Sequence, residues 1–175
     1  AFLAPSSGTA SAADYPTRPI ALVVPYPPGG GVDAMARVVA QKLSESLKQQ
    51  VVVENRGGAG GTIGTKLVAR AAPDGYTLLF NASTFVTAPL TMKSVPYKVQ
   101  ADFAPISLVA QAPLSIAIGN KVGVADLKGL ITAAKANPGK LNFATGSIGS
   151  AGHLCTVRLE QAAGISVTVV PYKGT

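Results

Sequence analysis

Two loops of small residues in the sequence could bind an anion through main-chain groups. The first glycine loop, residues 25–31 (PYPPGGG), and the last glycine loop, residues 145–152 (TGSIGSAG), each follow a short apolar run and precede a segment of helical period. Glycines let a ligand approach the backbone closely, and a helix start offers unpaired N–H groups at its positive dipole end. Such a turn suits a carboxylate or phosphate. The repetition predicts one anion held between two similar units.

Small hydroxyl side chains could complete this site. Ser83 and Thr84 follow a third apolar run, which we expect to lie parallel to the run before the first glycine loop. Ligands of open α/β sheets bind outside the carboxyl ends of the strands, so these loops could line one cleft. The candidate ligand-binding residues are Tyr26, Pro28, Gly29, Gly30, Gly31, Asp33, Ser83, Thr84, Thr145, Gly146, Ser147, Gly149, Ser150 and His153.

Several of these residues also have a purely structural interpretation. Tyr26 either forms a wall of the pocket or packs on the first glycine loop. Asp33 lies four residues before Arg37 in a first helical turn, and an ion pair near the positive helix end explains it adequately. His153 either braces its loop or contacts the ligand. The middle glycine loop, residues 57–61, favours a tight strand-to-helix turn over a ligand loop.

Most enzyme classes lack their required residues. The segment 58–64 misses the dinucleotide-binding spacing G-x-G-x-x-G, and Thr145 stands where a nucleophile elbow would need glycine. His153 is the only histidine and has no evident acidic partner. The single Cys155 excludes an internal disulfide, and its apolar neighbours predict a buried free thiol. We expect no enzyme activity, no metal and no cofactor, with a nucleotide-dependent oxidoreductase as the alternative.

Composition limits the partners. The 175 residues carry a net charge of +7, but only 13% are charged, and the basic residues are scattered rather than clustered. With 6% aromatic residues, this pattern argues against nucleic-acid binding and favours a weak positive field that attracts anionic solutes. No apolar run approaches the roughly 20 residues of a membrane span. We expect a monomer.

The order of elements predicts an α/β fold of two lobes, with parallel sheets flanked by helices. Residues 81–104 are expected to be an irregular connector, and the extended runs 105–110 and 114–118 to be strands that cross between the lobes. The predicted strands are 20–25, 51–54, 76–80, 141–144 and 166–170, and the predicted helices are 32–48, 62–72, 127–136 and 150–162.

The predicted organisation has three parts. Residues 1–12 are expected to be the remnant of a signal peptide, because an apolar stretch precedes the small-x-small site at Ala10 and Ala12. Lobe one would span residues 13–103. Residues 104–175 would form the first part of lobe two, which we expect to be truncated because nothing follows its last strand.

Six motifs in order resemble the Bug, or tripartite tricarboxylate transporter (TctC-like), periplasmic solute receptors. Together they cover nearly all of residues 15–175. The motifs are PYPPGGG at 25–31 with Asp33 and Arg37, VENR at 53–56 with GAGG at 58–61, PDGYTLL at 73–79, NPGKL at 137–141, GSAGHL at 149–154 and VPYKG at 170–174.

This resemblance implies a receptor whose two lobes close on a small organic carboxylate. In the family the loop after strand one and the serine/glycine loop of the second lobe hold the carboxylate, which points to residues 26–33 and 145–153 here. It also implies export to the periplasm, no enzymatic activity, and a membrane permease or a sensor protein as partner.

Overall fold

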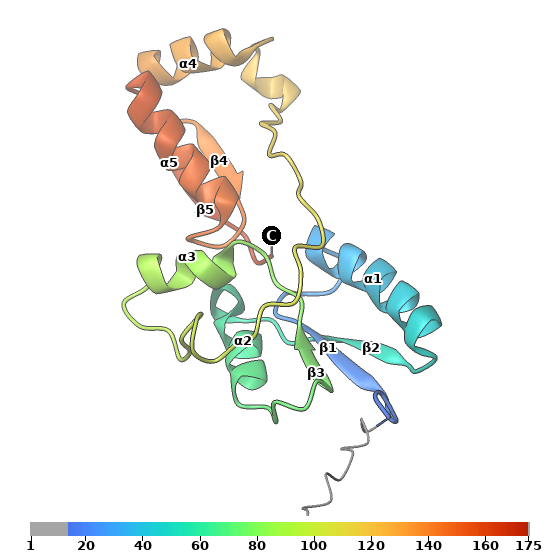
Figure 1. The fold of residues 1–175 in the computed structure, drawn as a ribbon. Helices are drawn as coiled ribbons and strands as arrows, with labels where there is room; N and C mark the ends of the chain where they lie inside the picture. The colour runs from blue at the N-terminus through green and yellow to red at the C-terminus, as the bar shows by residue number, and fades with distance from the viewer. Residues whose placement is uncertain (1–13, 175) are drawn as a thin grey trace, which may run out of the picture.

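The computed structural model describes residues 14–174 and contains two separate parallel sheets joined by a long connection (Figure 1). The predicted signal remnant, residues 1–12, lies outside the described residues. The parallel α/β architecture is confirmed. The division into lobes at residues 103 and 104 stays a prediction.

The first sheet has the strand order β2-β1-β3. Its central strand is β1 (Ile20–Val24), which pairs in parallel with β2 (Val51–Asn55) and β3 (Thr77–Leu79). The helix α1 (Gly31–Leu47) packs its small buried residues on this sheet, and α2 (Thr62–Ala69) also contacts β1. The sequence of β1 is an almost continuous apolar run, as expected for a strand that is covered on both faces of its sheet.

The second sheet is smaller. It pairs β4 (Asn142–Thr145) in parallel with β5 (Thr168–Pro171), and α5 (Ala151–Ala163) connects them. The helix α4 (Leu127–Ala136) begins at Asp126, whose carboxylate accepts a hydrogen bond from the Gly129 N–H at 2.7 Å. The strands predicted at 141–144 and 166–170 and the helices predicted at 127–136 and 150–162 are present, within one or two residues of their expected ends.

The irregular connector predicted for residues 81–104 is wrong in part, because it contains the helix α3 (Thr84–Thr91). Pro89 lies inside this helix and has no N–H to donate to the carbonyl of Phe85, four residues earlier. The buried Tyr97 supplies the missing donor: its hydroxyl donates to that carbonyl at 3.1 Å, and its ring stacks on Phe85. A long-range contact thus permits a helix that the local sequence disfavours.

The prediction of strands at 105–110 and 114–118 is also wrong. These residues run from the first sheet towards α4 without pairing (Figure 1), because no other described strand lies beside them to complete a ladder. Their apolar side chains remain exposed, including Ile106, Leu108 and Leu114. A short 3-10 turn at Asn120–Val122 leads from this segment towards α4.

Cys155 is exposed, which contradicts the predicted buried thiol. It lies on the face of α5 that, with β4 and residues 114–119, borders a mainly apolar cavity of about 590 Å³, here called the α5 cavity. Of the apolar residues near Cys155 in the sequence, Leu159 borders this cavity with it.

Within residues 14–174, the structure has no helix of the length and apolar character needed to cross a membrane.

Candidate ligand-binding site

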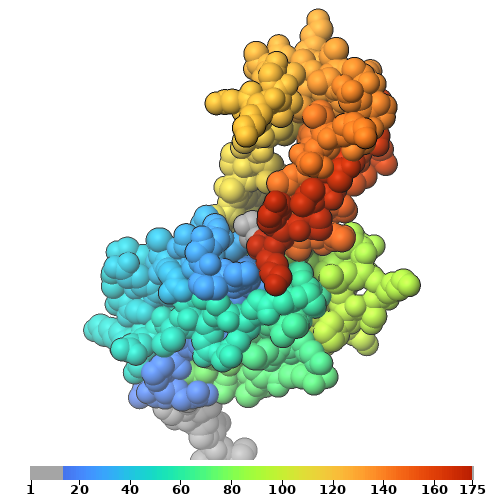
Figure 2. Space-filling model, turned by 180° about the vertical axis from the view of Figure 1, so that it is seen from behind, coloured from blue at the N-terminus to red at the C-terminus, as the bar shows by residue number. Residues whose placement is uncertain are grey.

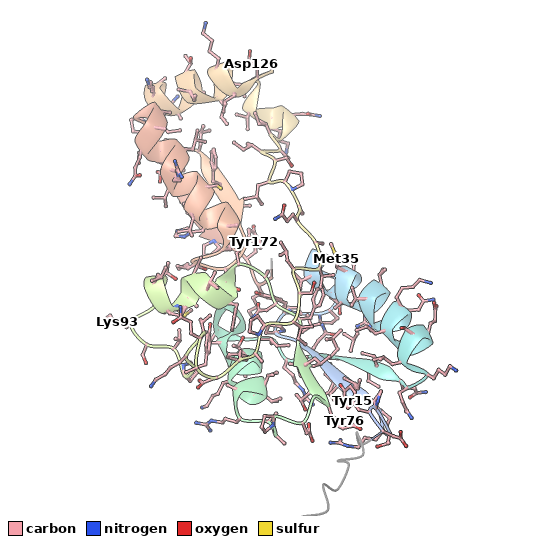
Figure 3. All side chains as sticks on the ribbon, viewed as in Figure 1. Tyr15, Met35, Tyr76, Lys93, Asp126 and Tyr172 are labelled. Atoms are coloured by element: carbon pink, nitrogen blue, oxygen red, sulfur yellow. The ribbon has the colours of Figure 1, made fainter. Side chains whose placement is uncertain are left out.

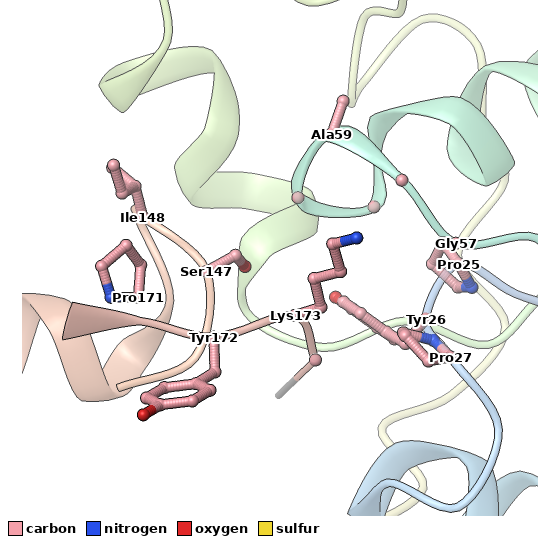
Figure 4. Close-up of a pocket in the computed structure, with 14 residues that line it drawn as sticks. Pro25, Tyr26, Pro27, Gly57, Ala59, Ser147, Ile148, Pro171, Tyr172 and Lys173 are labelled. Carbon is pink, nitrogen blue, oxygen red and sulfur yellow. The ribbon is translucent and has the colours of Figure 1, made fainter. Parts of the chain in front are cut away.

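Loops from both sheets meet at one cavity of about 430 Å³, the inter-sheet cavity (Figure 4). Seen from behind, the C-terminal residues that follow β5 reach down onto the part of the molecule that contains the first sheet (Figure 2). The aromatic pair Tyr15 and Tyr76 lies at the opposite end of the first sheet, away from Tyr172 (Figure 3). The lining residues are Pro25, Tyr26, Pro27, Gly57, Gly58, Ala59, Gly60, Gly61, Ser147, Ile148, Pro171, Tyr172, Lys173 and Gly174.

The first sheet contributes Tyr26 to the wall, at the point where β1 ends. The side chain is buried, and its hydroxyl donates to Asn81 Oδ1 at 2.5 Å and also hydrogen-bonds with Thr84 Oγ1. Burial raises the pKa of the Tyr26 phenol, so the group is protonated at neutral pH. Tyr26 therefore borders the cavity with its hydroxyl already hydrogen-bonded, and its role in ligand binding stays a prediction.

The middle glycine loop also forms part of the wall. The sequence favoured a tight turn here, and the loop does form a 3-10 turn at Ala59–Gly61 before α2. It also borders the cavity with Gly57, Gly58 and Gly60. Gly60 has φ +65°, and a Cβ at this position would lie 3.2 Å from Met92 Cε and 3.9 Å from Ser147 Oγ. Glycine at this position therefore lets the loop approach Met92 and Ser147 closely while its backbone borders the cavity.

The second sheet contributes Ser147 from the last glycine loop. The Ser147 hydroxyl is buried and has no hydrogen-bond partner among the described residues. Its backbone is well held, because its N–H donates to the Gly174 carbonyl at 3.3 Å and its carbonyl accepts from the Ser150 N–H at 2.9 Å. Buried polar atoms almost always have a partner, so an unpaired hydroxyl at a cavity wall indicates a position where a ligand can bind.

Lys173 brings a positive charge to the same cavity. It follows β5, and Figure 4 shows its side chain extending between Ser147 and Tyr26, with the amine directed towards the middle glycine loop. Neither Lys173 nor Tyr172 is among the site residues predicted from the sequence. Their signal was present, because both residues follow the carboxyl end of a predicted parallel strand, as the glycine loops do.

Asp33 holds the first glycine loop rather than facing the cavity. Its buried carboxylate accepts from the Gly29 N–H at 2.9 Å, from Asn55 Nδ2 at 2.9 Å and from Arg37 Nε at 3.0 Å. The Arg37 bond is the largest of the effects that lower the pKa of Asp33 to about 2, followed by the bonds from Gly29 and Asn55. The predicted ion pair is therefore present, as one part of a network that fixes the turn.

His153 braces its own loop. The Gly149 N–H donates to His153 Nδ1 at 3.2 Å, and the His153 N–H donates to Ser150 Oγ at 3.2 Å. This matches one of the two roles considered for His153, although contact with a ligand stays a prediction.

Tyr26 and Ser147 are the predicted site residues that line the inter-sheet cavity. Among the others, Thr145 borders the α5 cavity and Ser83 is exposed. The Thr84 hydroxyl already hydrogen-bonds with the Tyr26 hydroxyl. Their role in binding stays a prediction. The predicted residues outside the cavity wall are Pro28, Gly29, Gly30, Gly31, Asp33, Ser83, Thr84, Thr145, Gly146, Gly149, Ser150 and His153.

The chemistry that this arrangement supports is hydrogen bonding and charge pairing with an anion. The wall offers the Ser147 hydroxyl, which no other described residue hydrogen-bonds, the Lys173 ammonium group and the backbone of the middle glycine loop. In the part of the chain that the structure describes, His, Cys, Asp and Glu side chains form no group of three that could hold a metal ion.

Comparison with known proteins gives a consistent result. Residues 35–175 match the model of the "Tripartite tricarboxylate transporter family receptor". The chain is 46% identical over 170 residues to the protein BugT of Bordetella pertussis, an alignment that covers 94% of this chain and 51% of that protein.

Solved structures agree. A structure described as R. palustris Rpa4515 with adipate has a TM-score of 0.89 and 35% identity, and the match covers 91% of this chain and 54% of that one. The periplasmic binding protein BugD has a TM-score of 0.76 and 40% identity, with 92% and 54% covered.

The chain spans about half the length of the relatives it matches. The family is one of receptors rather than enzymes, which disfavours the oxidoreductase alternative. The matched family model, these relatives and the parallel α/β architecture together show that the chain belongs to the tripartite tricarboxylate transporter receptor family, as its motifs predicted.

Proposed function

We propose that this chain is the ligand-holding part of a receptor that binds a small organic carboxylate in the inter-sheet cavity. The observation that carries the proposal is the buried Ser147 hydroxyl, which has no partner in the described part of the chain and lies on a wall shared with Lys173. A carboxylate could accept a hydrogen bond from Ser147 and pair with the Lys173 ammonium. The structural neighbour with adipate supports this ligand class.

Calorimetry of the full-length protein tests the proposal, with adipate, succinate and NAD as separate probes. We expect heat from a dicarboxylate and none from NAD. The reverse result would favour the oxidoreductase alternative and would contradict the receptor. Removing a hydrogen bond to a charged group typically costs about 1.5–3 kcal/mol, so Ser147→Ala should weaken binding by about tenfold or more.

Two lysine variants test whether the Lys173 ammonium group contributes to binding. Lys173→Gln should weaken dicarboxylate binding, because it removes the ammonium from the cavity wall. The matched controls Lys135→Gln and Ser166→Ala alter exposed residues away from the cavity and should bind as the wild type does. Equal binding by Ser147→Ala, Lys173→Gln and the wild type would place the ligand elsewhere.

We also propose that the receptor works outside the cytoplasm, where it presents its ligand to a membrane permease or to a sensor. The support is the family itself, together with the neighbour described as a periplasmic binding protein. Fractionation of cells that produce the full-length protein should recover it in the periplasmic extract. Recovery only with the cytoplasmic fraction would contradict this location.

A further inference from the structure

The helix α3 reaches from the first half of the structure to the last glycine loop. Thr87 Oγ1 donates to the Gly149 carbonyl at 2.6 Å, although the two residues are 62 positions apart. The same hydroxyl lies 3.1 Å from the Ser83 carbonyl of its own helix, so the longer-range contact is the shorter one. Neither Thr87 nor Gly149 lines the inter-sheet cavity.

The last glycine loop fits closely against α3 at this point. Gly149 is buried and has φ +81°, and a Cβ there would lie 2.5 Å from Thr91 Oγ1. Its N–H is held within the second unit by His153 Nδ1 at 3.2 Å. Gly149 is therefore fixed from both sides, by α5 through its N–H and by α3 through its carbonyl.

The loop held in this way also carries Ser147, whose hydroxyl is the ligand contact proposed above. The Ser147 carbonyl accepts from the Ser150 N–H at 2.9 Å, so Ser147 belongs to the same tight turn as Gly149. We infer that Thr87 is a latch. Its hydroxyl hydrogen-bonds to Gly149 when the two parts of the molecule, one with each sheet, are closed over the inter-sheet cavity, and this bond breaks when they open. This inference extends the proposed carboxylate receptor.

The expected effect follows from one hydrogen bond. A neutral hydrogen bond contributes about 1 kcal/mol net, equivalent to about a fivefold change in the ratio of closed to open molecules. Apparent affinity falls in proportion to the closed fraction, provided that the ligand binds the closed state. Loss of the latch should therefore weaken binding by up to about fivefold, mainly through faster release.

Two Thr87 variants of the full-length protein isolate the hydroxyl. Thr87→Val keeps the shape of the side chain but removes the donor, whereas Thr87→Ser keeps the donor. The matched control is Thr132→Val, because Thr132 donates to the carbonyl of Lys128 in its own helix at 2.9 Å and has no role at the cavity. The control also corrects for the bond from Thr87 to Ser83 that the valine removes.

Spin labels measure opening directly. Labels on Gln41→Cys in α1 and Lys135→Cys in α4, both exposed, report the distance between the units in a Cys155→Ser background. We expect Thr87→Val to increase the population of long distances without ligand and to weaken adipate binding. Thr87→Ser and Thr132→Val should behave as the wild type does.

The outcomes separate the latch from the proposed function. Unchanged distances in Thr87→Val would overturn the latch, as would an equal change in Thr132→Val or no rescue by Thr87→Ser. If the wild type fails to bind adipate or succinate, the carboxylate proposal fails, yet a shift to longer distances in ligand-free Thr87→Val would still support the latch.

Discussion

The two sheets use the same local design but differ in how completely it is buried. In the first sheet, Leu22 and Val24 of the central strand are at most 3% exposed, and helices cover both faces. In the second sheet, β4 and β5 contain no fully buried residue, and the α5 cavity remains beside them. The difference shows that an apolar strand becomes a core only when other elements cover it.

The first region is the better buried, but the helices of the second region have the better side-chain caps at their N-termini. Those of the second region have side-chain caps, because Asp126 begins α4 and Ser150 begins α5 with hydrogen bonds to the backbone. In the first region, α1 and α2 begin at Gly30 and Gly61, which have no side chain, and α3 begins at Ser83, whose side chain makes no cap hydrogen bond. Local capping therefore supports the less buried region, and tertiary packing supports the other.

The largest expected effect is a difference between two matched valines. Val24→Ala in β1 should lower the free energy of unfolding by about 2–3 kcal/mol, because it removes two methyl groups from a fully buried site and leaves a cavity. Val169→Ala in the half-buried β5 should have less than half that effect. Urea denaturation followed by circular dichroism measures both, and equal losses would contradict the comparison.

Two helix glycines provide the next test. A Cβ on Gly64 in α2 would lie 2.6 Å from the Arg56 carbonyl oxygen, so Gly64→Ala should lower stability by about 1–3 kcal/mol despite the better helix propensity of alanine. On Gly152 in α5 the nearest atom would be 3.9 Å away. Gly152→Ala should therefore be neutral or stabilising by thermal unfolding, and destabilisation there would show that α5 is more tightly packed.

Removing the N-cap of α4 should have a smaller effect on the free energy of unfolding. Asp126→Ala should lower stability by about 1 kcal/mol, because it removes the acceptor of the Gly129 N–H at the start of α4. Asp14→Ala, an exposed residue before β1, is the charge-matched control and should change the unfolding midpoint little. If both variants lose the same stability, net charge rather than the cap is responsible.

The loops of the two regions should respond differently to acid. Because the folded pKa of Asp33 is about 2, below its ordinary 3.8, its ionised form stabilises the fold above about pH 4, and this contribution is lost as the pH falls towards 2. Asp33→Asn should thus be less stable than the wild type at neutral pH, with the gap closing between pH 4 and pH 2.

Urea midpoints across that range check this prediction, with Asp14→Asn as the control. A gap independent of pH would mean that the charge of Asp33 does not contribute. The last glycine loop is held instead by Ser150 and His153, so the prediction applies to the first loop.

The sequence predicted the regular elements well because their signals are local. The glycine turns, the Asp126 cap and the apolar runs each act within a few residues. The helix α3 could not be predicted in this way, because Pro89 argues against a helix and the compensating donor, Tyr97, lies outside it. The predicted burial of Cys155 was wrong for a related reason, since apolar neighbours in the sequence indicate burial only where another element covers them.

The candidate site was predicted less completely than the fold. Strand order and direction predicted that the loops after parallel strands would meet at one edge, and Tyr26 and Ser147 do line the same cavity. Lys173 and the middle glycine loop were not assigned to it, although they follow strands as well. Side-chain direction and hydrogen bonding, as at Asp33, decide which residues of a loop face a ligand.

The amino-acid sequence by itself determined the family, the alternation of strands and helices, and the loops that could hold an anion, because each depends on short-range patterns. The tertiary structure alone decided that the Ser147 hydroxyl has no partner within residues 14–174, while the side chains of Asp33 and Tyr26 are hydrogen-bonded. It also decided that Thr87 reaches Gly149. These outcomes depend on contacts between residues far apart in the chain, whose positions are set only when the two sheets pack.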